Sequence, residues 1–401
     1  MLKKRSVGFL RGYQYFFHST NAIMIGFLPI YFKSQGLSGA EIGALLAVGP
    51  FASLFSQPFW GYMSDKYKTV KKMLMICLVG FLLAGLLFFS MDAFMLMIMT
   101  GFVLFFFMSP LGALGDSLSQ RTAAEKNISF GGIRAWGSIG FATTSLLTGA
   151  IFSVIGVERI LLPFLFFGFL ALLSGFSVSD VKVSNKKLRL KDVRKLTNDL
   201  PFLLFLFLIL FITVTHRTND SFIGIYVKSL GGTDSLVGWA WFIGVASEAA
   251  VFALGYAWFR RFHELTFITF AGFLYTLRWV LYAFVTDPHW LVFFQVLHGI
   301  TFGIFYLASV QYVTKVVPKE LQATGLLLFI SVFFGLSGII GGLLGGFLMD
   351  QAGGHVLYGV MSVTAFAGSL GITAYGVVRK KKRERAAAAV GQKSLSAGGQ
   401  R

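Results

Sequence analysis

The sequence predicts an all-α integral membrane protein with twelve transmembrane helices, arranged as two pseudo-symmetric six-helix bundles with both termini in the cytoplasm. Three observations predict this class: an apolar composition, apolar runs long enough to cross a bilayer, and a polar pattern shared by the two halves. Hydrophobic residues make up 56% of the 401 residues and charged residues 13%, about half the charged share of soluble proteins. We therefore expect a chain that spans a membrane.

The apolar runs give the expected helices. A bilayer core needs about 20 predominantly apolar residues per helix. Twelve such runs lie at 8–32, 40–64, 72–91, 94–118, 132–155, 159–178, 201–227, 236–259, 265–286, 289–314, 322–349 and 356–378. We expect an N-terminal bundle at 1–178, a central cytoplasmic loop at 179–199 and a C-terminal bundle at 200–378. The basic tail at 379–401 is expected to be disordered and cytoplasmic.

The positive charge lies mostly on one predicted side. The net charge is +18, and we assign 28 of the 35 Lys and Arg residues to the side of the termini. Only Lys33, Arg159 and Lys228 fall in the opposite loops. This asymmetry follows the positive-inside rule and places both termini in the cytoplasm of a multi-pass protein of the inner (plasma) membrane. The charge thus reflects topology, and we expect no nucleic-acid partner.

Other classes of site have little support in the sequence. The chain has one cysteine, Cys77, inside an apolar run, so neither a disulfide framework nor a metal site is expected. No nucleophile–base pattern suggests an enzyme. The expected partners are a small-molecule substrate and the lipid bilayer, and we expect a functional monomer. No cofactor is expected beyond the proton as coupling ion.

The two halves share polar motifs at similar positions. His-Ser-Thr-Asn at 18–21 in the first span recurs as His-Arg-Thr-Asn at 216–219 in the seventh. Parallel repeats predict a pseudo-two-fold axis along the membrane normal, with a substrate site between the halves. Chance identity in helices rich in Phe and Gly is the alternative. On the repeat hypothesis, we assign His18, Asn21 and Asn219 to the substrate site.

In the N-terminal half, an acid and an arginine occupy neighbouring spans. Asp116 lies near the inner end of the fourth span and Arg134 near the inner end of the fifth. These helices are antiparallel neighbours with a short connection, so the two side chains can meet. An arginine–carboxylate pair can offer its remaining N–H and oxygen groups to a polar substrate. The alternative is an interfacial salt bridge that only positions the loop.

In the C-terminal half, Glu248 is an isolated acid in an Ala-rich stretch of the eighth span. An apolar setting favours the neutral form of an acid, as a proton carrier requires. Arg278 and His298 are its expected partners, although a helix–helix hydrogen bond is an alternative role for His298. Asp220 is a further candidate carrier, but its spacing from Arg217 also predicts a structural pair within the seventh span.

The end of the second span carries a family motif. Gly61, Asp65 and Lys66, followed by two further lysines, resemble the loop signature G-x-x-x-D-[RK] of the major facilitator superfamily. The resemblance covers essentially the whole chain and implies the twelve-helix transporter fold. It also implies that Asp65 helps latch the two halves on the cytoplasmic side, with Gly61 and Lys66 beside it. A solvated loop acid is the alternative. The match is partial, because Lys68 and Thr69 replace the usual Gly-basic pair.

A narrower resemblance is to the branch that holds lactose permease, nucleoside–proton symporters and phenylpropionate permeases. It rests on residues 110–117 and 134–141, and on the eighteen-residue separation of Asp116 and Arg134. The resemblance implies that this pair binds substrate, and we add Trp136 and Phe141 to the same site. Phe141 stands where lactose permease has its galactoside-stacking Trp, so galactosides are not the expected substrates.

The same branch implies a site for proton coupling. Its Glu, Arg and His on the eighth, ninth and tenth spans resemble Glu248, Arg278 and His298. The second acid that follows the His in lactose permease is missing, because Thr301 and Phe302 stand there. The proton-carrying acid is therefore Glu248, Asp116 or Asp220 on this reading.

The first functional hypothesis is a proton-coupled symporter that imports a small polar solute, such as a sugar or nucleoside, by alternating access. The second is a drug/proton antiporter, which the many aromatic residues favour. The fifth span, however, lacks the Gly-Pro signature of antiporters. The third is a transporter-like sensor that moves no substrate across the membrane. Only the basic tail favours this hypothesis.

Overall fold

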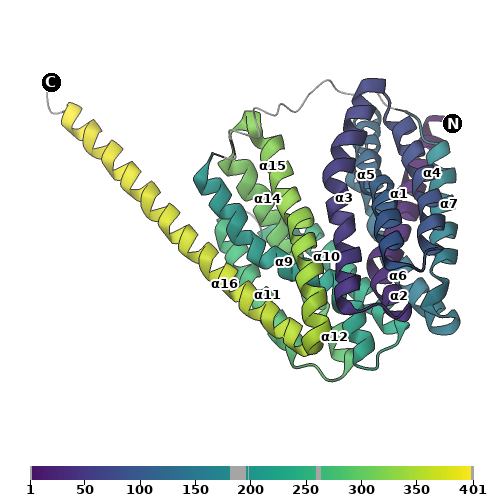
Figure 1. Cartoon of the computed structure of the whole chain (residues 1–401). Coiled ribbons are helices and arrows are strands. Elements are labelled where there is room, and N and C mark those ends of the chain that lie inside the picture. Colours follow the sequence, from purple (N-terminus) through teal and green to yellow (C-terminus); the bar gives the residue numbers. More distant parts are fainter. Residues whose placement is uncertain (1, 181–195, 197, 259–262, 399–401) are drawn as a thin grey trace.

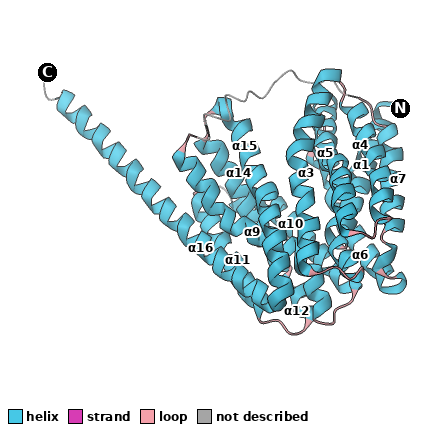
Figure 2. Cartoon of the chain, in the orientation of Figure 1, coloured by secondary structure: helices cyan, strands magenta, loops and turns pink. Residues whose placement is uncertain are grey.

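The computed structural model describes residues 2–180, 196, 198–258 and 263–398, which are almost entirely helical (Figures 1 and 2). Its first helices are α1 (Leu2–Gly26), α2 (Leu28–Ser34), α3 (Gly39–Tyr67), α4 (Val70–Phe89), α5 (Phe94–Lys126), α6 (Gly131–Ile155) and α7 (Leu161–Phe176), with a 3₁₀ turn η1 at Val157–Arg159. The later helices are α9 (Leu200–Ser229), α10 (Asp234–Trp258), α11 (Glu264–Ala283), α12 (Pro288–Phe294), α13 (Val296–His298), α14 (Ile304–Val316), α15 (Gln322–Ile330) and α16 (Ser337–Gly398). Three short turns interrupt them: η2 (Gly299–Gly303), η3 (Lys319–Leu321) and η4 (Ser331–Leu336). The predicted all-α class is confirmed.

Ten helical segments in the described residues are long and apolar enough to cross a membrane. One of them is the continuous segment Thr324–Lys381, in which Gly353 has a φ of +76° and the chain turns back on itself (Figure 1). Helix α1, which carries Arg11 and His18, is not among the ten. The chain is thus a multi-pass membrane protein, while the count of twelve spans and the side of the termini stay predictions.

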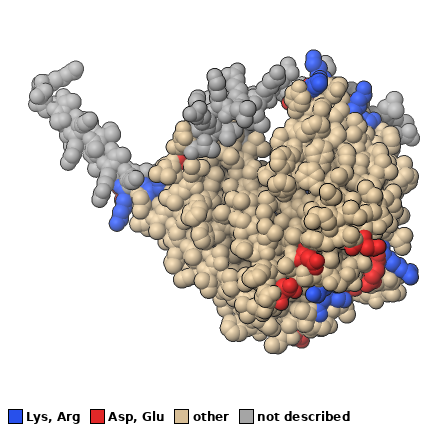
Figure 3. Space-filling model, viewed as in Figure 1, with Lys and Arg blue, Asp and Glu red and all other residues tan. Residues whose placement is uncertain are grey.

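Charged side chains in Figure 3 gather toward two ends of the molecule, with a broad uncharged band between them. We call the end at which α3 finishes and α4 begins the basic end, because Lys66, Lys71 and Lys72 lie there. An apolar band between charged ends is what a bilayer requires of the protein surface. The band therefore marks the membrane-facing surface.

Figure 1 shows α1–α7 gathered on one side of the molecule and α9–α16 on the other. We call these the N-terminal and C-terminal bundles. Most of the loop predicted at 179–199 lies outside the described residues, so the domain boundaries stay predictions. The predicted disorder of the tail differs from the structure, in which α16 continues as a helix to Gly398. The physical reason is the run of Lys, Arg, Glu and Ala at 380–389, since these residues favour helix.

The two bundles touch closely at the end opposite the basic end. A Cβ atom on Gly43 of α3 would lie 2.2 Å from the carbonyl oxygen of Gly342 in α16. A Cβ atom on Gly238 of α10 would lie 2.4 Å from the carbonyl oxygen of Ser145 in α6. Gly342 and Gly346 of α16 therefore lie in a close helix contact with α3. Only residues without side chains permit these backbones to approach so closely.

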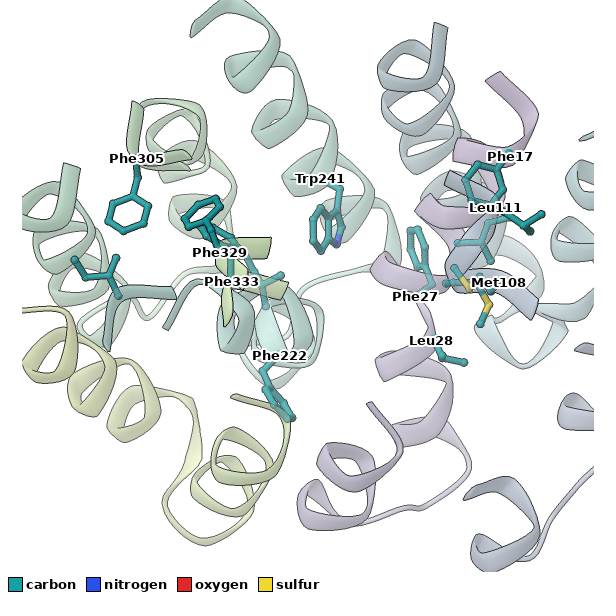
Figure 4. Packing of buried hydrophobic residues seen from close by; sticks show 14 of the residues in the cluster. Phe17, Phe27, Leu28, Met108, Leu111, Phe222, Trp241, Phe305, Phe329 and Phe333 are labelled. Carbon is teal, nitrogen blue, oxygen red and sulfur yellow. The ribbon is translucent and has the colours of Figure 1, made fainter. Parts of the chain in front are cut away.

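Buried aromatic side chains continue from one bundle into the other. Figure 4 shows Trp241 of α10 between Phe27 on the side of the N-terminal bundle and Phe333 on the side of the C-terminal bundle. Trp241 also makes an edge-to-face contact with Phe141 of α6, with ring centroids 5.7 Å apart. We call the end opposite the basic end the closed end. It is therefore held by packed aromatic rings as well as by backbone contacts.

Several predicted spans are broken helices. The first span divides at Phe27, and Pro29 lies in the first turn of α2, where its missing N–H is tolerated. The tenth span divides at Gln295 and then contains a π-helical turn at Gly299–Gly303. By contrast, Pro58 lies within the unbroken helix α3. A π-helical turn re-aims side chains and is often found at functional sites, and His298 stands directly before this one.

Candidate functional site

The predicted pair of the N-terminal bundle forms. Arg134 Nε of α6 lies 3.2 Å from Asp116 Oδ1 of α5, and the two side chains are 35% and 40% exposed. Their spacing in the sequence predicted this contact, which the structure confirms. Because both groups stay partly exposed, each can exchange part of its contact for a ligand with a small desolvation penalty.

Helix α1 supplies further polar groups to this pair. Gln14 Nε2 donates to Asp116 Oδ1 at 3.1 Å and to Ser119 Oγ at 2.9 Å. His18 and Arg134 both lie against Gly137, since a Cβ atom there would meet His18 Nδ1 at 2.9 Å and the Arg134 guanidinium at 2.6 Å. The structure thus brings His18 to the pair as expected. Gln14 was missed, although it precedes His18 by one turn on the same face of α1.

Asn21 follows His18 by three residues on α1 and is partly exposed. Its side chain makes no hydrogen bond with the described residues. It therefore stays a candidate for the substrate site on position alone.

The two aromatic candidates on α6 lie on different faces of the helix. Phe141 follows Arg134 by seven residues and therefore returns to nearly the same face. Trp136 follows by two residues and lies about 200° around the helix, with 40% of its side chain exposed. The assignment of Trp136 to the same site stays a prediction, which its position on another face of α6 does not favour.

In the C-terminal bundle, Glu248 meets His298 as predicted. Glu248 Oε2 of α10 lies 3.9 Å from His298 Nε2, and the side chains are 24% and 7% exposed. The expected partner Arg278 reaches Glu248 only through this histidine, because its guanidinium lies 3.4 Å from His298 Nδ1. A guanidinium can only donate, so Nδ1 accepts and neutral His298 carries its proton on Nε2, facing Glu248.

Arg278 itself is fully buried and held by neutral groups. It donates to Gln295 Oε1 at 2.5 Å, to Thr301 Oγ1 at 3.3 Å and to the hydroxyl of Tyr282. Its guanidinium also lies 4.7 Å from the ring centroid of Trp279. A buried cation is retained only when hydrogen bonds and ring contacts replace its hydration. These contacts therefore fix Arg278 firmly in place.

Asp220 of α9 has the partner that its spacing predicts. Its Oδ2 lies 2.8 Å from Arg217 and 3.4 Å from His216 Nε2, and its side chain is 9% exposed. Asn219 was assigned to the substrate site, but it is buried and its Oδ1 accepts from Tyr358 of α16 at 3.1 Å. The neighbouring helix within the same bundle thus takes up the amide oxygen, and the assignment of Asn219 to the substrate site stays a prediction.

One cluster could not be seen in the sequence. The side-chain nitrogen or oxygen atoms of His216, Asp220 and His298 lie within 4.8 Å of one another. This spacing is within reach of a metal ion, but Arg217 and Arg278 flank the cluster, and their positive charges oppose a divalent cation. The expectation of no metal site therefore stays a prediction.

The polar groups of the two bundles lie within electrostatic reach of each other. The positive charge of Arg134 in the N-terminal bundle acts on Glu248 in the C-terminal bundle. The negative charge of Asp220, in the same bundle as Glu248, acts on Glu248 with the opposite sign. Charged groups of both bundles therefore influence Glu248.

The predicted gate residues lie near the basic end of the N-terminal bundle. Gly61 and Asp65 line a cavity of about 220 Å³ together with Gln57, Ser117 and Arg121. Lys66 lies beside them, with Nζ 5.6 Å from the ring centroid of Tyr67. All these residues belong to one bundle, so a latch between bundles stays a prediction.

The loop after the gate residues explains the departure from the family motif. Lys68 has a φ of +53° and ends α3 in the left-handed conformation that favours glycine. The family usually has Gly there, and this chain tolerates lysine instead. Thr69 then caps α4 by accepting from the backbone N–H of Lys72 at 3.1 Å.

Residues 9–360 match the family model of the MFS_1 like family. An uncharacterized transporter of Bacillus subtilis, YwbF, is 28% identical over 95% of this chain and 96% of its own length. Maltose permease of Geobacillus stearothermophilus is 28% identical over 86% of this chain and 88% of its own length. These relatives are transporters rather than enzymes.

Two further relatives differ in what their names describe. The probable 3-phenylpropionic acid transporter of Escherichia coli is 28% identical, and a multi-drug resistance efflux pump of Streptococcus pneumoniae is 24% identical. Among solved structures, a D323A mutant of the nucleoside transporter NupG superposes with a TM-score of 0.83 at 17% identity. That superposition covers 94% of this chain and all of NupG, and it shows a shared fold.

Proposed function

This chain belongs to the MFS_1 like family of secondary transporters, and we propose that it is a proton-coupled symporter that imports a small polar solute. Sugars and nucleosides are the proposed substrate classes. The observation that carries the proposal is the contact of Glu248, an isolated and largely buried acid of α10, with His298 at 3.9 Å. A carboxyl group so placed can respond to both proton and substrate.

In the proposed mechanism, substrate binds at the half-exposed Asp116–Arg134 pair, with Gln14 and His18 beside it. Substrate that engages Arg134 changes the charge that Glu248 experiences, and protonation of Glu248 changes the charge near Arg134. Each event thereby alters the free energy of the other, which is the reciprocal linkage that a symporter needs. Alternating access follows when the two bundles separate at the closed end and meet at the basic end.

The proposal is tested by uptake into proteoliposomes that contain the purified protein. Radiolabelled maltose, uridine and 3-phenylpropionate are offered in turn, with and without an imposed inward proton gradient. We expect the gradient to drive accumulation of maltose or uridine above the outside concentration, whereas accumulation of 3-phenylpropionate alone would contradict the proposed substrate classes. Uptake that only equilibrates would indicate a uniporter. Absence of uptake of all three would contradict the proposed substrate classes.

We also propose that the basic end is cytoplasmic in the inner membrane and that twelve spans place both termini there. Cys77 is buried and is the only cysteine, so Cys77→Ser provides a background for single-cysteine labelling. Cysteines placed at 179–199 or after 379 should react with an impermeant reagent only from the cytoplasm. Cysteines at 33–39 and 229–235 should react only from outside. A tail that reacts from outside would overturn this topology.

A drug/proton antiporter is the second candidate, favoured by the similarity to a multi-drug efflux pump. The fifth span, GSIGFATTSLLTG at 137–149, does not contain the Gly-Pro signature of antiporters. Everted vesicles distinguish the two functions. An antiporter would concentrate ethidium in such vesicles when their lumen is acidic, whereas a symporter would not.

A further inference from the structure

His216 of α9 is held by contacts on both ring nitrogens and on its face. Its Nδ1 lies 3.1 Å from the hydroxyl of Tyr275, and its Nε2 lies 3.4 Å from Asp220 Oδ2. The ring stacks on Phe302 with centroids 4.8 Å apart and an angle of 5° between the planes. The side chain is 3% exposed. A buried imidazole with three such contacts has a defined orientation.

These contacts determine which nitrogen carries the proton. Arg217 donates a hydrogen bond to Asp220 Oδ2 at 2.8 Å, so this oxygen acts as an acceptor. His216 therefore presents an Nε2–H to Asp220, and its Nδ1 accepts from the Tyr275 hydroxyl. The order of the groups is donor, histidine, acid.

The same order of donor, histidine and acid occurs in the neighbouring side chains Arg278, His298 and Glu248. Arg278 donates to His298 Nδ1, and His298 presents its Nε2–H to Glu248, with the two heavy atoms 3.9 Å apart. The two imidazole rings lie 5.5 Å apart, and Phe302 contacts both. Two groups of side chains therefore lie side by side in the same order, Tyr275–His216–Asp220 and Arg278–His298–Glu248.

Both donors come from one helix. Tyr275 and Arg278 are separated by three residues on α11, so they project from the same face. The histidines lie on α9 and α13, and the acids on α9 and α10. Movement of α11 relative to these helices would break both donor contacts at once.

We propose that Tyr275, His216 and Asp220 form a second proton-linked site, and that α11 sets the tautomers of both histidines. The inference rests on the proposed proton coupling. While α11 is in place, both Nε2–H groups favour ionised acids and so favour proton release. When α11 withdraws, either histidine can carry its proton on Nδ1, and its Nε2 then accepts from a protonated acid.

A free acceptor on Asp220 supports this role. Asp220 Oδ1 is buried and has no hydrogen-bond partner among the described residues, so it offers a position for a proton. The charged groups that face the two sets are Arg217 from α9, Arg278 from α11, Glu248 from α10 and, from the other bundle, Arg134. Neither histidine changes its charge in this scheme, so α11 controls only which ring nitrogen carries the single proton. Tyr275 is thus a positioning residue that acts through His216.

The test is ¹⁵N NMR of the full chain labelled at histidine, with the six signals assigned by single His→Gln variants. In the wild type, we expect neutral His216 and His298, each with its proton on Nε2. Tyr275→Phe removes the donor to His216, so we expect its Nδ1–H form to increase about tenfold while His298 stays unchanged. Tyr226→Phe is the matched control, because it removes a buried hydroxyl that contacts His355 instead.

Transport separates this inference from the proposed function. With whichever of maltose, uridine or 3-phenylpropionate the wild type accumulates, Tyr275→Phe should lower proton-driven accumulation about tenfold and leave exchange within about twofold. A His216 signal with its proton on Nδ1 in the wild type, or unchanged by Tyr275→Phe, overturns the inference while proton coupling stands. Expected tautomers in a wild type whose uptake only equilibrates overturn the coupling role and the proposed symport together, because transport then proceeds without the proton.

Discussion

The polar groups of the two bundles differ most in their exposure. In the N-terminal bundle, the Asp116 and Arg134 side chains are 40% and 35% exposed. In the C-terminal bundle, His298 and Asp220 are 7% and 9% exposed, and Arg278 is completely buried. The first set is arranged like a site that a ligand can enter. The second is arranged like a network that holds its charges in fixed positions.

This difference assigns separate tasks to the bundles. A half-exposed ion pair contributes little to stability, so its partners can be exchanged for a substrate. A buried network stabilises the protein only when every member is paired, and gain or loss of one proton disturbs all its members. We therefore expect substrate affinity to depend on the N-terminal bundle and proton coupling on the C-terminal bundle. The predictions below test this division.

The largest expected effect is on substrate affinity. Asp116→Asn and Arg134→Ala should each weaken binding at least about a hundredfold, because each removes a charge-assisted contact and unpairs the remaining charge. Isothermal titration with the transported compound measures this, and retained thermal unfolding checks the fold. Wild-type affinity in both variants would show that the pair is a salt bridge that only positions the loop. It would also contradict the assignment of substrate binding to the N-terminal bundle.

Stability should show the reverse pattern. Arg278→Gln removes hydrogen bonds to Gln295, Thr301 and Tyr282 in a buried site, so we expect a loss on the order of 3 kcal/mol. Arg134→Gln should cost less than about 1 kcal/mol, because its ion pair is screened by water. Apparent melting temperatures in detergent compare the two variants. Equal destabilisation would show that the bundles are not specialised in this way.

Sequence patterns predicted the features that depend on neighbouring positions along the chain. The apolar runs predicted the helices, and the short connection between two antiparallel helices predicted the Asp116–Arg134 pair. Spacing within one helix likewise predicted the Arg217–Asp220 contact. The amide of Asn219 and the indirect path from Arg278 to Glu248 were not predicted. Both depend on helices far apart in the sequence, and no pattern within one helix reports which face meets which neighbour.

The histidine cluster shows the same limit. His216 was visible as a polar residue in the seventh span, but its contacts with Tyr275 and Phe302 come from other helices. The π-helical turn at Gly299–Gly303 also sets how the residues after His298 are aimed, and hydropathy does not distinguish it from an α-helix. Helical periodicity alone places Trp136 on another face of α6 than Arg134, and the assignment of Trp136 to the same site did not use that observation.

The smallest expected effects test the aromatic boundary of the site. Phe141→Leu should weaken substrate binding about three- to tenfold, since it removes a ring on the face of Arg134 that also contacts Trp241. Trp136→Phe should change affinity by less than about twofold, because this side chain lies on another face of α6. The same titration measures both variants. A larger effect of Trp136→Phe would place the substrate outside the proposed site.

The division of tasks is tested most directly by Glu248→Gln, assayed for accumulation and exchange in the same proteoliposomes. The amide keeps the size of the side chain, including its place 3.9 Å from His298, but cannot ionise. We predict that proton-driven accumulation is lost while exchange between equal pools stays within about threefold of the wild type. Asp116→Asn, by contrast, should lose both activities. A Glu248→Gln variant that still concentrates its substrate against a gradient would contradict the central claim and move the coupling acid to Asp220.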